Sequence, residues 1–452
     1  MRIMFIIPRI SGGGAEKVLT ALASRLAGKH EIFLVTTIMK DGTEEYPLSD
    51  KVKVISLHKR MYPGAYGIQP VKKTDSKDSK VYKLLKKIAF KILPVPVINK
   101  KREISANPQV EELRKIKQEV CPDCAVSFLN SANYLNVMSK GNEKTIISIR
   151  SCLTGPFAPV EIRNPGGRER IIETCQKADR IVSISEETAA GLVKDFGADP
   201  RKITVINNMC DVSEIKELSQ KKPEDKALLE AIDKAGFVFF ASGRLTLKKG
   251  QWHLVRAFGE VVRKHPEAIL IILGREGKGD ENTAGLLKEI IAKKGLQDKV
   301  FLPGFKMNPF QYLKLGNAFV MSSFNEGFPN ALVEAMALGL PAIASDCSSG
   351  PREILAPETD CVVKTQGLEH AQYGILVKEA SGKICTDEPI EEAETYLAQA
   401  MNELIENGEL RRHYQEQSLK SVERYSQEII TEAWEKLFAD QTDTYKCDNI
   451  DL

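Results

Sequence analysis

Short runs of apolar residues recur along the chain, and most are followed by a segment whose apolar positions have helical spacing. The first series of predicted strands covers residues 2–8, 31–37, 51–57, 124–129, 144–150, 180–185 and 203–207. The second series covers residues 237–243, 268–274, 299–304, 318–322, 341–345 and 374–377. Strands that alternate with helices in this way are typical of parallel sheets with crossover helices. The pattern predicts an α/β protein with two doubly wound sheets.

The boundary between the two series falls near residue 210. The chain of 452 residues exceeds what a single hydrophobic core usually supports, and the Lys- and Glu-rich stretch 214–234 is typical of a solvated helix or connector. We therefore predict an N-terminal domain over residues 1–210 and a C-terminal domain over residues 211–426. A last helix is predicted within residues 427–440, with an apolar face formed by Ile430, Ala433, Trp434, Leu437 and Phe438. We expect it to pack back on the N-terminal domain.

The composition is that of an ordinary globular protein, with a net charge of +3 and nine cysteines. An odd number of scattered cysteines does not suit a disulfide framework, so we interpret them as reduced thiols. Cys121 and Cys124 have the spacing of a zinc pair or a redox motif, but no second pair accompanies them, and structural cysteines are favoured. The chain has no apolar run of about 18 residues and begins directly with a strand, which predicts a cytoplasmic protein.

A basic segment over residues 72–102 interrupts the first series of strands. It carries ten Lys and one Arg against Asp75 and Asp78. Within residues 81–93, an apolar helical face is formed by Leu84, Leu85, Ile88 and Ile92, opposite a Lys-rich face. A cationic amphipathic helix suits an anionic membrane surface, although a surface helix packed on its own domain remains an alternative. Nucleic acid is disfavoured as a partner because the segment lacks interleaved aromatic residues and the remaining chain is nearly neutral.

The clearest candidate for chemistry follows the predicted strand 318–322. Pro329 and Gly339 are placed to begin and end a helix, with Glu326 in the loop before it and Glu334 on its second turn. A helix start at the carboxyl end of a parallel strand binds phosphates through free N–H groups, here those of Asn330 and Ala331. Flanking carboxylates suit sugar hydroxyls. Periodicity alone leaves open an ordinary amphipathic helix with solvated glutamates.

Two further loops are candidates for the site, and each follows the first predicted strand of one series. Gly243-Arg244-Leu-Thr-Leu-Lys248-Lys249-Gly250 supplies cations, which stabilise the negative charge of a departing diphosphate. In the first domain, the glycines of Ser11-Gly-Gly-Gly-Ala-Glu16 allow close approach of a phosphate or a sugar. This loop fails the dinucleotide fingerprint, because Lys17 stands where Gly or Ala is required.

Taken together, these segments resemble family 4 glycosyltransferases, which are retaining enzymes with the GT-B fold of two Rossmann-like domains around a cleft. Glu326 and Glu334 match the family's E-x7-E signature, and the Arg244 loop resembles its GR-x(n)-KG element. Gly12–Glu16 resembles a GGAE-type loop, and Ser148-Ile-Arg150 resembles a motif of relatives that build lipid-linked saccharides. Further agreement covers residues 183–186, 205–208, 273–277, 339–346 and 349–353.

The resemblance implies a role for each matching residue. Glu326 would contact the donor sugar and Glu334 the nucleotide ribose, while Arg244 and Lys249 would neutralise the diphosphate. The donor site would be completed by Gly243, Gly327, Phe328, Pro329, Asn330 and Ala331. The phosphate or acceptor loop would consist of Gly12, Gly13, Gly14 and Glu16, with Arg150 on the acceptor side.

The implied reaction is retaining transfer of a hexosyl group from a UDP-sugar to a polyprenyl-diphosphate-linked saccharide in polysaccharide or glycan biosynthesis. It implies no covalent intermediate, no cofactor and no metal, and we expect peripheral association with the cytoplasmic face of the membrane. Similarity to users of UDP-galactose and UDP-N-acetylgalactosamine favours galactose or N-acetylgalactosamine as the donor sugar.

Some features depart from the family or leave alternatives open. His30 and His58 lack the context of the family's N-terminal histidine, so we assign no catalytic histidine. The sequence has no Asp-x-Asp motif, which leaves metal-dependent binding of the sugar nucleotide without support. A GT-B sugar-nucleotide isomerase or epimerase and a non-catalytic nucleotide-sugar-binding subunit are the alternatives. Both are disfavoured by the complete set of donor-side residues.

Overall fold

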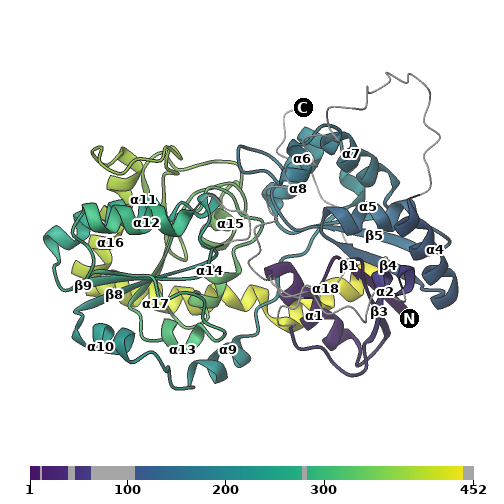
Figure 1. Cartoon of the computed structure of the whole chain (residues 1–452), viewed down its shortest axis with the longest axis horizontal. Helices are drawn as coiled ribbons and strands as arrows, with labels where there is room; N and C mark the ends of the chain where they lie inside the picture. The colour runs from purple at the N-terminus through teal and green to yellow at the C-terminus, as the bar shows by residue number, and fades with distance from the viewer. Residues whose placement is uncertain (11–12, 39–45, 63–106, 277–281, 441–452) are drawn as a thin grey trace, which may run out of the picture.

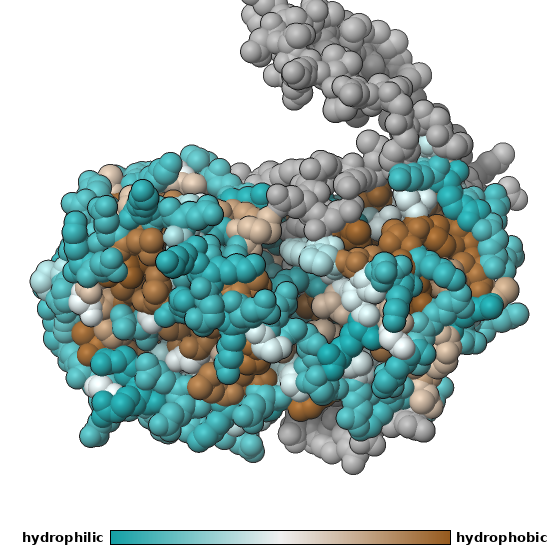
Figure 2. Space-filling model, turned by 90° about the horizontal axis from the view of Figure 1, so that it is seen from below, coloured by the Kyte–Doolittle hydropathy of each residue, from teal (hydrophilic) through white to brown (hydrophobic). Residues whose placement is uncertain are grey.

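The computed structural model describes residues 1–10, 13–38, 46–62, 107–276 and 282–440. They form two lobes, each with a sheet between layers of helices (Figure 1). Polar and charged side chains cover much of both lobes when the molecule is seen from below, and exposed apolar residues lie in separate patches (Figure 2). The basic segment 72–102, its predicted helix 81–93 and Gly12 lie outside the described residues.

The N-terminal sheet has the strand order β3-β2-β1-β4-β5-β6-β7, and its strand pairs are parallel throughout the described residues. Its strands are β1 (Arg2–Ile7), β2 (Glu31–Thr36), β3 (Lys53–Ser56), β4 (Cys124–Phe128), β5 (Lys144–Ile149), β6 (Arg180–Ser183) and β7 (Ile203–Val205). Its helices are α1 (Gly14–Leu26), α2 (Leu57–Met61), α4 (Pro108–Val120), α5 (Asn130–Met138), α6 (Val160–Arg163), α7 (Gly167–Lys177) and α8 (Glu186–Phe196).

The C-terminal sheet has the order β10-β9-β8-β11-β12-β14-β13. Its strands are β8 (Phe237–Ser242), β9 (Ala268–Leu273), β10 (Val300–Phe301), β11 (Ala318–Met321), β12 (Ala342–Ser345), β13 (Leu368–His370) and β14 (Ile375–Val377). Its helices are α10 (Lys226–Lys234), α11 (Gln251–Lys264), α12 (Thr283–Lys293), α13 (Phe310–Leu313), α14 (Asn330–Met336), α15 (Pro351–Leu355), α16 (Glu392–Glu406) and α17 (Gly408–Val422).

The predicted α/β architecture is confirmed, and each apolar run named above contains a strand. Strands such as β9 are buried along their whole length because helices cover both faces of the sheet. The sequence missed β13, which pairs antiparallel with β14 at the sheet edge. Its three residues, Leu-Glu-His, lack both an apolar run and an alternating pattern.

The stretch 214–234 is less solvated than predicted. It forms the end of a helix, α9 (Val212–Ser219), and α10, and the buried side chains Ile215, Leu228 and Ile232 belong to the C-terminal core. The charged residues occupy the other faces of two amphipathic helices. Each helix therefore has a buried apolar face and a solvated charged face, which the average composition of the stretch does not reveal.

The chain passes between the lobes twice. It first crosses after β7, and it returns after α17 to form α18 (Gln427–Phe438) on the N-terminal lobe (Figure 1). Trp434 of α18 stacks on Phe128 of β4 with ring centroids 5.8 Å apart, inside the N-terminal core. The two crossings run side by side, because the N–H of Cys210 donates to the carbonyl of Tyr425 at 2.7 Å and Cys210 pairs with Ser426 as a parallel bridge. Among the described helices, none combines the length and apolar character required to span a bilayer.

Candidate functional site

The loop between β11 and α14 carries Glu326, and α14 itself carries Glu334. The predicted helix between Pro329 and Gly339 is present as Asn330–Met336, and Gly339 lies beyond its end with a φ of +76°. Pro329 provides no side-chain cap to the first turn. Glu326 is only 7% exposed. The sequence placed this residue in a loop, and the structure shows that the loop holds it as a buried carboxylate.

Lys249 lies against this carboxylate, with 2.6 Å between its Nζ and Oε1 of Glu326. The approach depends on Gly250, which has a φ of +60° and directly follows Lys249. A Cβ at Gly250 would lie 2.2 Å from the carbonyl oxygen of Ser322, which is too close for any other residue without a shift of the backbone. The loop after β8 therefore packs directly on the strand end that precedes Glu326.

The charges around Glu326 keep it ionised. Burial alone would raise the pKa of Glu326, but the ammonium groups of Lys249 and Lys248 outweigh burial, and its pKa lies below the usual value. Burial lowers the pKa of Lys248, with Glu326 opposing the shift. Lys249 makes the direct contact, whereas Lys248 acts on Glu326 through its charge.

The glycine-rich loop of the N-terminal domain faces the start of α14. A Cβ added at Gly14 would lie 3.1 Å from Nδ2 of Asn330, so the two domains approach closely there. Glu16 is buried, and its carboxylate folds over Gly13, where a Cβ would lie 2.3 Å from Oε2. Burial raises the pKa of Glu16, with the charges of Arg9 and Arg244 opposing it. The charge of Arg244 therefore reaches Glu16 across the domain boundary.

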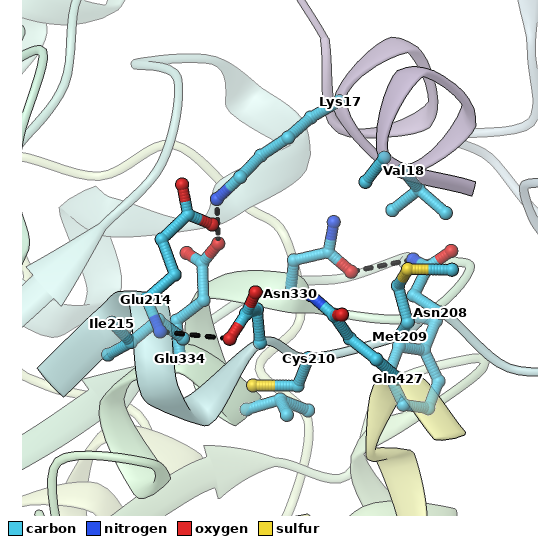
Figure 3. Close-up of a pocket in the computed structure, with 14 residues that line it drawn as sticks. Lys17, Val18, Asn208, Met209, Cys210, Glu214, Ile215, Asn330, Glu334 and Gln427 are labelled. Carbon is cyan, nitrogen blue, oxygen red and sulfur yellow. Dashed lines mark hydrogen bonds and ion pairs between the residues drawn. The ribbon is translucent and has the colours of Figure 1, made fainter. Parts of the chain in front are cut away.

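Two residues to which the sequence analysis gave no role, Lys17 and Asn208, link the domains at α14. Lys17 Nζ lies 2.6 Å from Oε1 of Glu334, and Asn208 Nδ2 donates to Oδ1 of Asn330 at 2.6 Å. Figure 3 shows both contacts at a pocket of about 60 Å³ between α1, the first crossing and α14. Lys17 was considered only as a mismatch to a fingerprint, and nothing in the sequence identified its partner.

Arg150 joins the same group of residues from the end of β5. Its guanidinium donates to Oδ1 of Asn208 and to Oγ of Ser148, and it lies over the ring of Phe128 at 4.9 Å. Burial lowers the pKa of Arg150 to about 9. No carboxylate of the described residues forms an ion pair with this partly buried guanidinium, which lies beside the first crossing.

The loop after Arg150 covers the Glu326 loop. The N–H of Cys152 donates to the carbonyl of Glu326 at 3.1 Å, and Asn325 Nδ2 donates to the carbonyl of Thr154 at 3.3 Å. Phe157 stacks on Phe324 with centroids 5.1 Å apart. The wall around Glu326 thus contains residues from both domains.

Two further motifs from the sequence meet at the domain boundary. Ser185 Oγ at the start of α8 lies 2.5 Å from Oγ of Ser349, and the N–H of Glu186 donates to Oε2 of Glu353 at 2.9 Å. Ser185 and Ser349 are fully buried. Segments 183–186 and 349–353 therefore hold the two domains together through buried polar contacts.

Metal-binding chemistry has no candidate in the part of the chain that the structure describes. No group of three or more His, Cys, Asp or Glu side chains is arranged to hold a metal ion there. Cys121 and Cys124 are both free thiols, the first exposed and the second buried.

Comparison with known proteins places the chain in a family. A model described as Glycosyltransferase Family 4 matches residues 12–214, and one described as Glycosyl transferases group 1 matches residues 229–375. The uncharacterized glycosyltransferase MJ1059 of Methanocaldococcus jannaschii is 34% identical over 344 residues, which cover 72% of this chain and 81% of that protein. The chain belongs to glycosyltransferase family 4.

Other similar proteins include a relative that is named for a specific reaction and a solved structure. The N-acetylgalactosamine-N,N'-diacetylbacillosaminyl-diphospho-undecaprenol 4-alpha-N-acetylgalactosaminyltransferase of Campylobacter jejuni is 28% identical over 305 residues, which cover 67% of this chain and 72% of that enzyme. The crystal structure of Anabaena Alr3699/HepE in complex with UDP has a TM-score of 0.67 and 16% identity, covering 97% of this chain and 100% of that one. This likeness shows the GT-B fold.

Proposed function

We propose that this glycosyltransferase moves a hexosyl group from a UDP-sugar to a hydroxyl of a lipid-diphosphate-linked saccharide, with retention at the anomeric carbon. The observation that carries the proposal is the contact between Lys249 and the buried carboxylate of Glu326, beside the loop that the N-terminal domain lays over Glu326. It places an ionised carboxylate and a cation within one small site, as recognition of a sugar joined to a diphosphate requires.

Departure of the nucleoside diphosphate builds negative charge on its leaving oxygen. Lys249 and Arg244 stabilise this charge as it develops, and the N–H groups of Asn330 and Ala331 add hydrogen bonds. Glu326 accepts hydrogen bonds from sugar hydroxyls, and its lowered pKa keeps it an acceptor at neutral pH. Gly243 and residues 327–331 form the walls of this half of the site.

The proposed transfer needs no nucleophile from the protein. The bond between the anomeric carbon and the phosphate oxygen breaks, and a bond to the acceptor oxygen forms on the same face of the sugar. The proton of the acceptor hydroxyl passes to the leaving phosphate oxygen. Glu326 is held by Lys249 throughout, which suits a carboxylate that orients the sugar.

An acceptor with a diphosphate is supported by Arg150, whose partly buried charge is available to an anionic group. The name of the Campylobacter jejuni relative describes a diphospho-undecaprenol acceptor, and that of an Escherichia coli relative describes a UDP-Gal donor. We propose that the basic segment 72–102 brings the enzyme to an anionic membrane surface that holds the acceptor. Deletion of residues 75–100 should then release the protein from anionic vesicles, and unchanged binding would refute this contact.

The test incubates the full chain with four UDP-sugars (glucose, galactose, N-acetylglucosamine and N-acetylgalactosamine), each with and without a polyprenyl-diphosphate-linked saccharide. Transfer to the acceptor with an unchanged anomeric configuration, measured by NMR, supports the proposal. Arg244→Ala and Glu326→Ala should each lower turnover about 100-fold to 1000-fold. The control is Lys264→Met, which removes an exposed cation paired with Glu406 far along α11 and should leave turnover unchanged.

Three outcomes would contradict the proposal. Near-normal turnover in both alanine variants would exclude the assigned site. An isomerised nucleotide sugar without any acceptor would identify an isomerase, and binding of UDP-sugars without any turnover would identify a non-catalytic subunit.

A further inference from the structure

One ion pair joins the proposed ribose-binding carboxylate to the opposite domain. Lys17 lies on the first turn of α1 in the N-terminal domain, whereas Glu334 lies on α14 in the C-terminal domain, 317 positions later in the chain. The Lys17 ammonium donates to Oε1 of Glu334 at 2.6 Å. Figure 3 shows the Lys17 side chain extended from α1 toward Glu334.

The surroundings of Lys17 hold its ammonium in place. The ring of Phe310 lies 5.3 Å from Nζ, and Glu214 lies beside Glu334 in Figure 3. Burial alone would lower the pKa of Lys17, but Glu334 outweighs it, helped by Glu214 and Tyr46, and the pKa is raised. The side chain is 43% exposed, so an incoming nucleotide has access to the pair.

A ribose-binding carboxylate has a physical difficulty that this pair relieves. The ribose is joined directly to the diphosphate, so a lone carboxylate that accepts its hydroxyls also repels the phosphates. An ammonium on the same carboxylate cancels most of this repulsion. Its bond to Oε1 also restrains the carboxylate rotamer and leaves Oε2 available to accept from ribose hydroxyls.

We propose that Lys17 is a positioning residue that holds Glu334 for the ribose of the donor nucleotide, so that the N-terminal domain takes part in nucleotide recognition. The inference rests on the proposed function, because it assumes that Glu334 binds the ribose. It assigns Lys17, on the first turn of α1, to the donor site. A ligand without ribose hydroxyls gains nothing from this arrangement.

The test measures dissociation constants of the full chain by calorimetry for UDP and for 2',3'-dideoxy-UDP. Lys17→Met should weaken UDP binding roughly tenfold, as expected for loss of one charge-assisted hydrogen bond. It should also bring the ratio of the two dissociation constants close to one. Lys17→Arg should retain most of the wild-type ratio. Lys29→Met, which removes an exposed ammonium paired with Glu435 just after α1, is the matched control and should change neither constant.

A double variant that exchanges the two charges distinguishes two roles of Lys17: positioning Glu334 for the ribose, and merely holding the two domains together. Lys17→Glu combined with Glu334→Lys restores an ion pair between α1 and α14, but it removes the carboxylate from α14. The inference requires that UDP binding stays weak in this double variant. Recovery of wild-type UDP affinity would overturn it, because an attachment role alone would then suffice.

The two proposals fail in distinguishable ways. Wild-type protein that discriminates UDP from its dideoxy analogue, with the same ratio in Lys17→Met, overturns the role of Lys17 and leaves the proposed function intact. Wild-type protein that binds neither nucleotide and transfers no sugar overturns the proposed function, and the inference with it. Equal melting temperatures of the variants and the wild type establish that the affinities compare folded proteins.

Discussion

Glu353 of the C-terminal domain accepts a hydrogen bond from Asn207 at the first crossing, with 2.8 Å between Oε1 and Nδ2. Its other oxygen accepts from the N–H of Glu186 at the start of α8. Burial raises the pKa of Glu353 to about 7, although both hydrogen bonds oppose the shift. Nearby Glu186 adds to the increase and Arg424 counteracts it. A carboxyl group that titrates near neutral pH therefore lies in the contact between the domains.

This contact predicts a loss of stability as pH rises. Glu353 releases its proton near pH 4.5 in the unfolded chain and near pH 7 in the folded protein, so the folded state binds more protons between these values. The free energy of unfolding should fall from about pH 4.5 to about pH 7, and Glu353 should add no further change above that. Glu353→Gln should reduce the slope of this dependence, measured by urea denaturation at pH 5, 6, 7 and 8.

Two other glutamates bear on the interpretation of this measurement. Glu358 is exposed and lies just after α15, so Glu358→Gln is the control and should keep the wild-type dependence. Burial also raises the pKa of Glu379 to about 7, so Glu353→Gln should retain part of the slope. A slope identical to that of the wild type would show that Glu353 does not titrate in this range.

Gly250 predicts a second measurable difference. Alanine at this position meets the Ser322 carbonyl and must adopt a positive φ, whereas alanine at Gly197 has a φ of +63° but no atom within 4 Å of its Cβ. Gly197→Ala should therefore cost about 1 kcal/mol of unfolding free energy. Gly250→Ala should cost more and should also lower sugar transfer, because Lys249 moves with it. Equal losses of stability with unchanged turnover in both variants would contradict the close packing of the loop on the strand end.

The third prediction concerns α18. Trp434 is 2% exposed in the N-terminal core, so Trp434→Ala should lower the unfolding free energy by about 3–5 kcal/mol. Ile429→Ala removes an apolar side chain from the exposed face of the same helix and should change it by less than about 0.5 kcal/mol. Guanidinium denaturation followed by fluorescence measures both. Small effects from both substitutions would show that α18 adds little to the N-terminal domain.

The sequence predicted the features that depend on local pattern. The buried strands have continuous apolar runs, and Pro329 and Gly339 bound α14 because of their own backbone preferences. The three residues of β13 join the sheet through hydrogen bonds to β14, and these leave no pattern in the side chains.

Contacts between segments that are distant in the sequence could not be predicted from local sequence patterns. The pairing of Lys17 with Glu334 and the bond from Asn208 to Asn330 depend on how two separately folded sheets meet. Each of these side chains alone is an ordinary polar residue on a helix or in a loop. The burial of Glu326 likewise depends on a loop from the other domain, in which the N–H of Cys152 donates to the carbonyl of Glu326.

The paired crossings at Cys210 and Ser426 limit how the lobes can move. A single connecting strand would let one lobe swivel freely, but two backbone segments joined by a hydrogen bond resist torsion about their common direction. Bending across both segments at once is the easier deformation. We therefore expect a change in the separation of α1 and α14 to occur by bending at Cys210 and Ser426, and not by twisting of one lobe against the other.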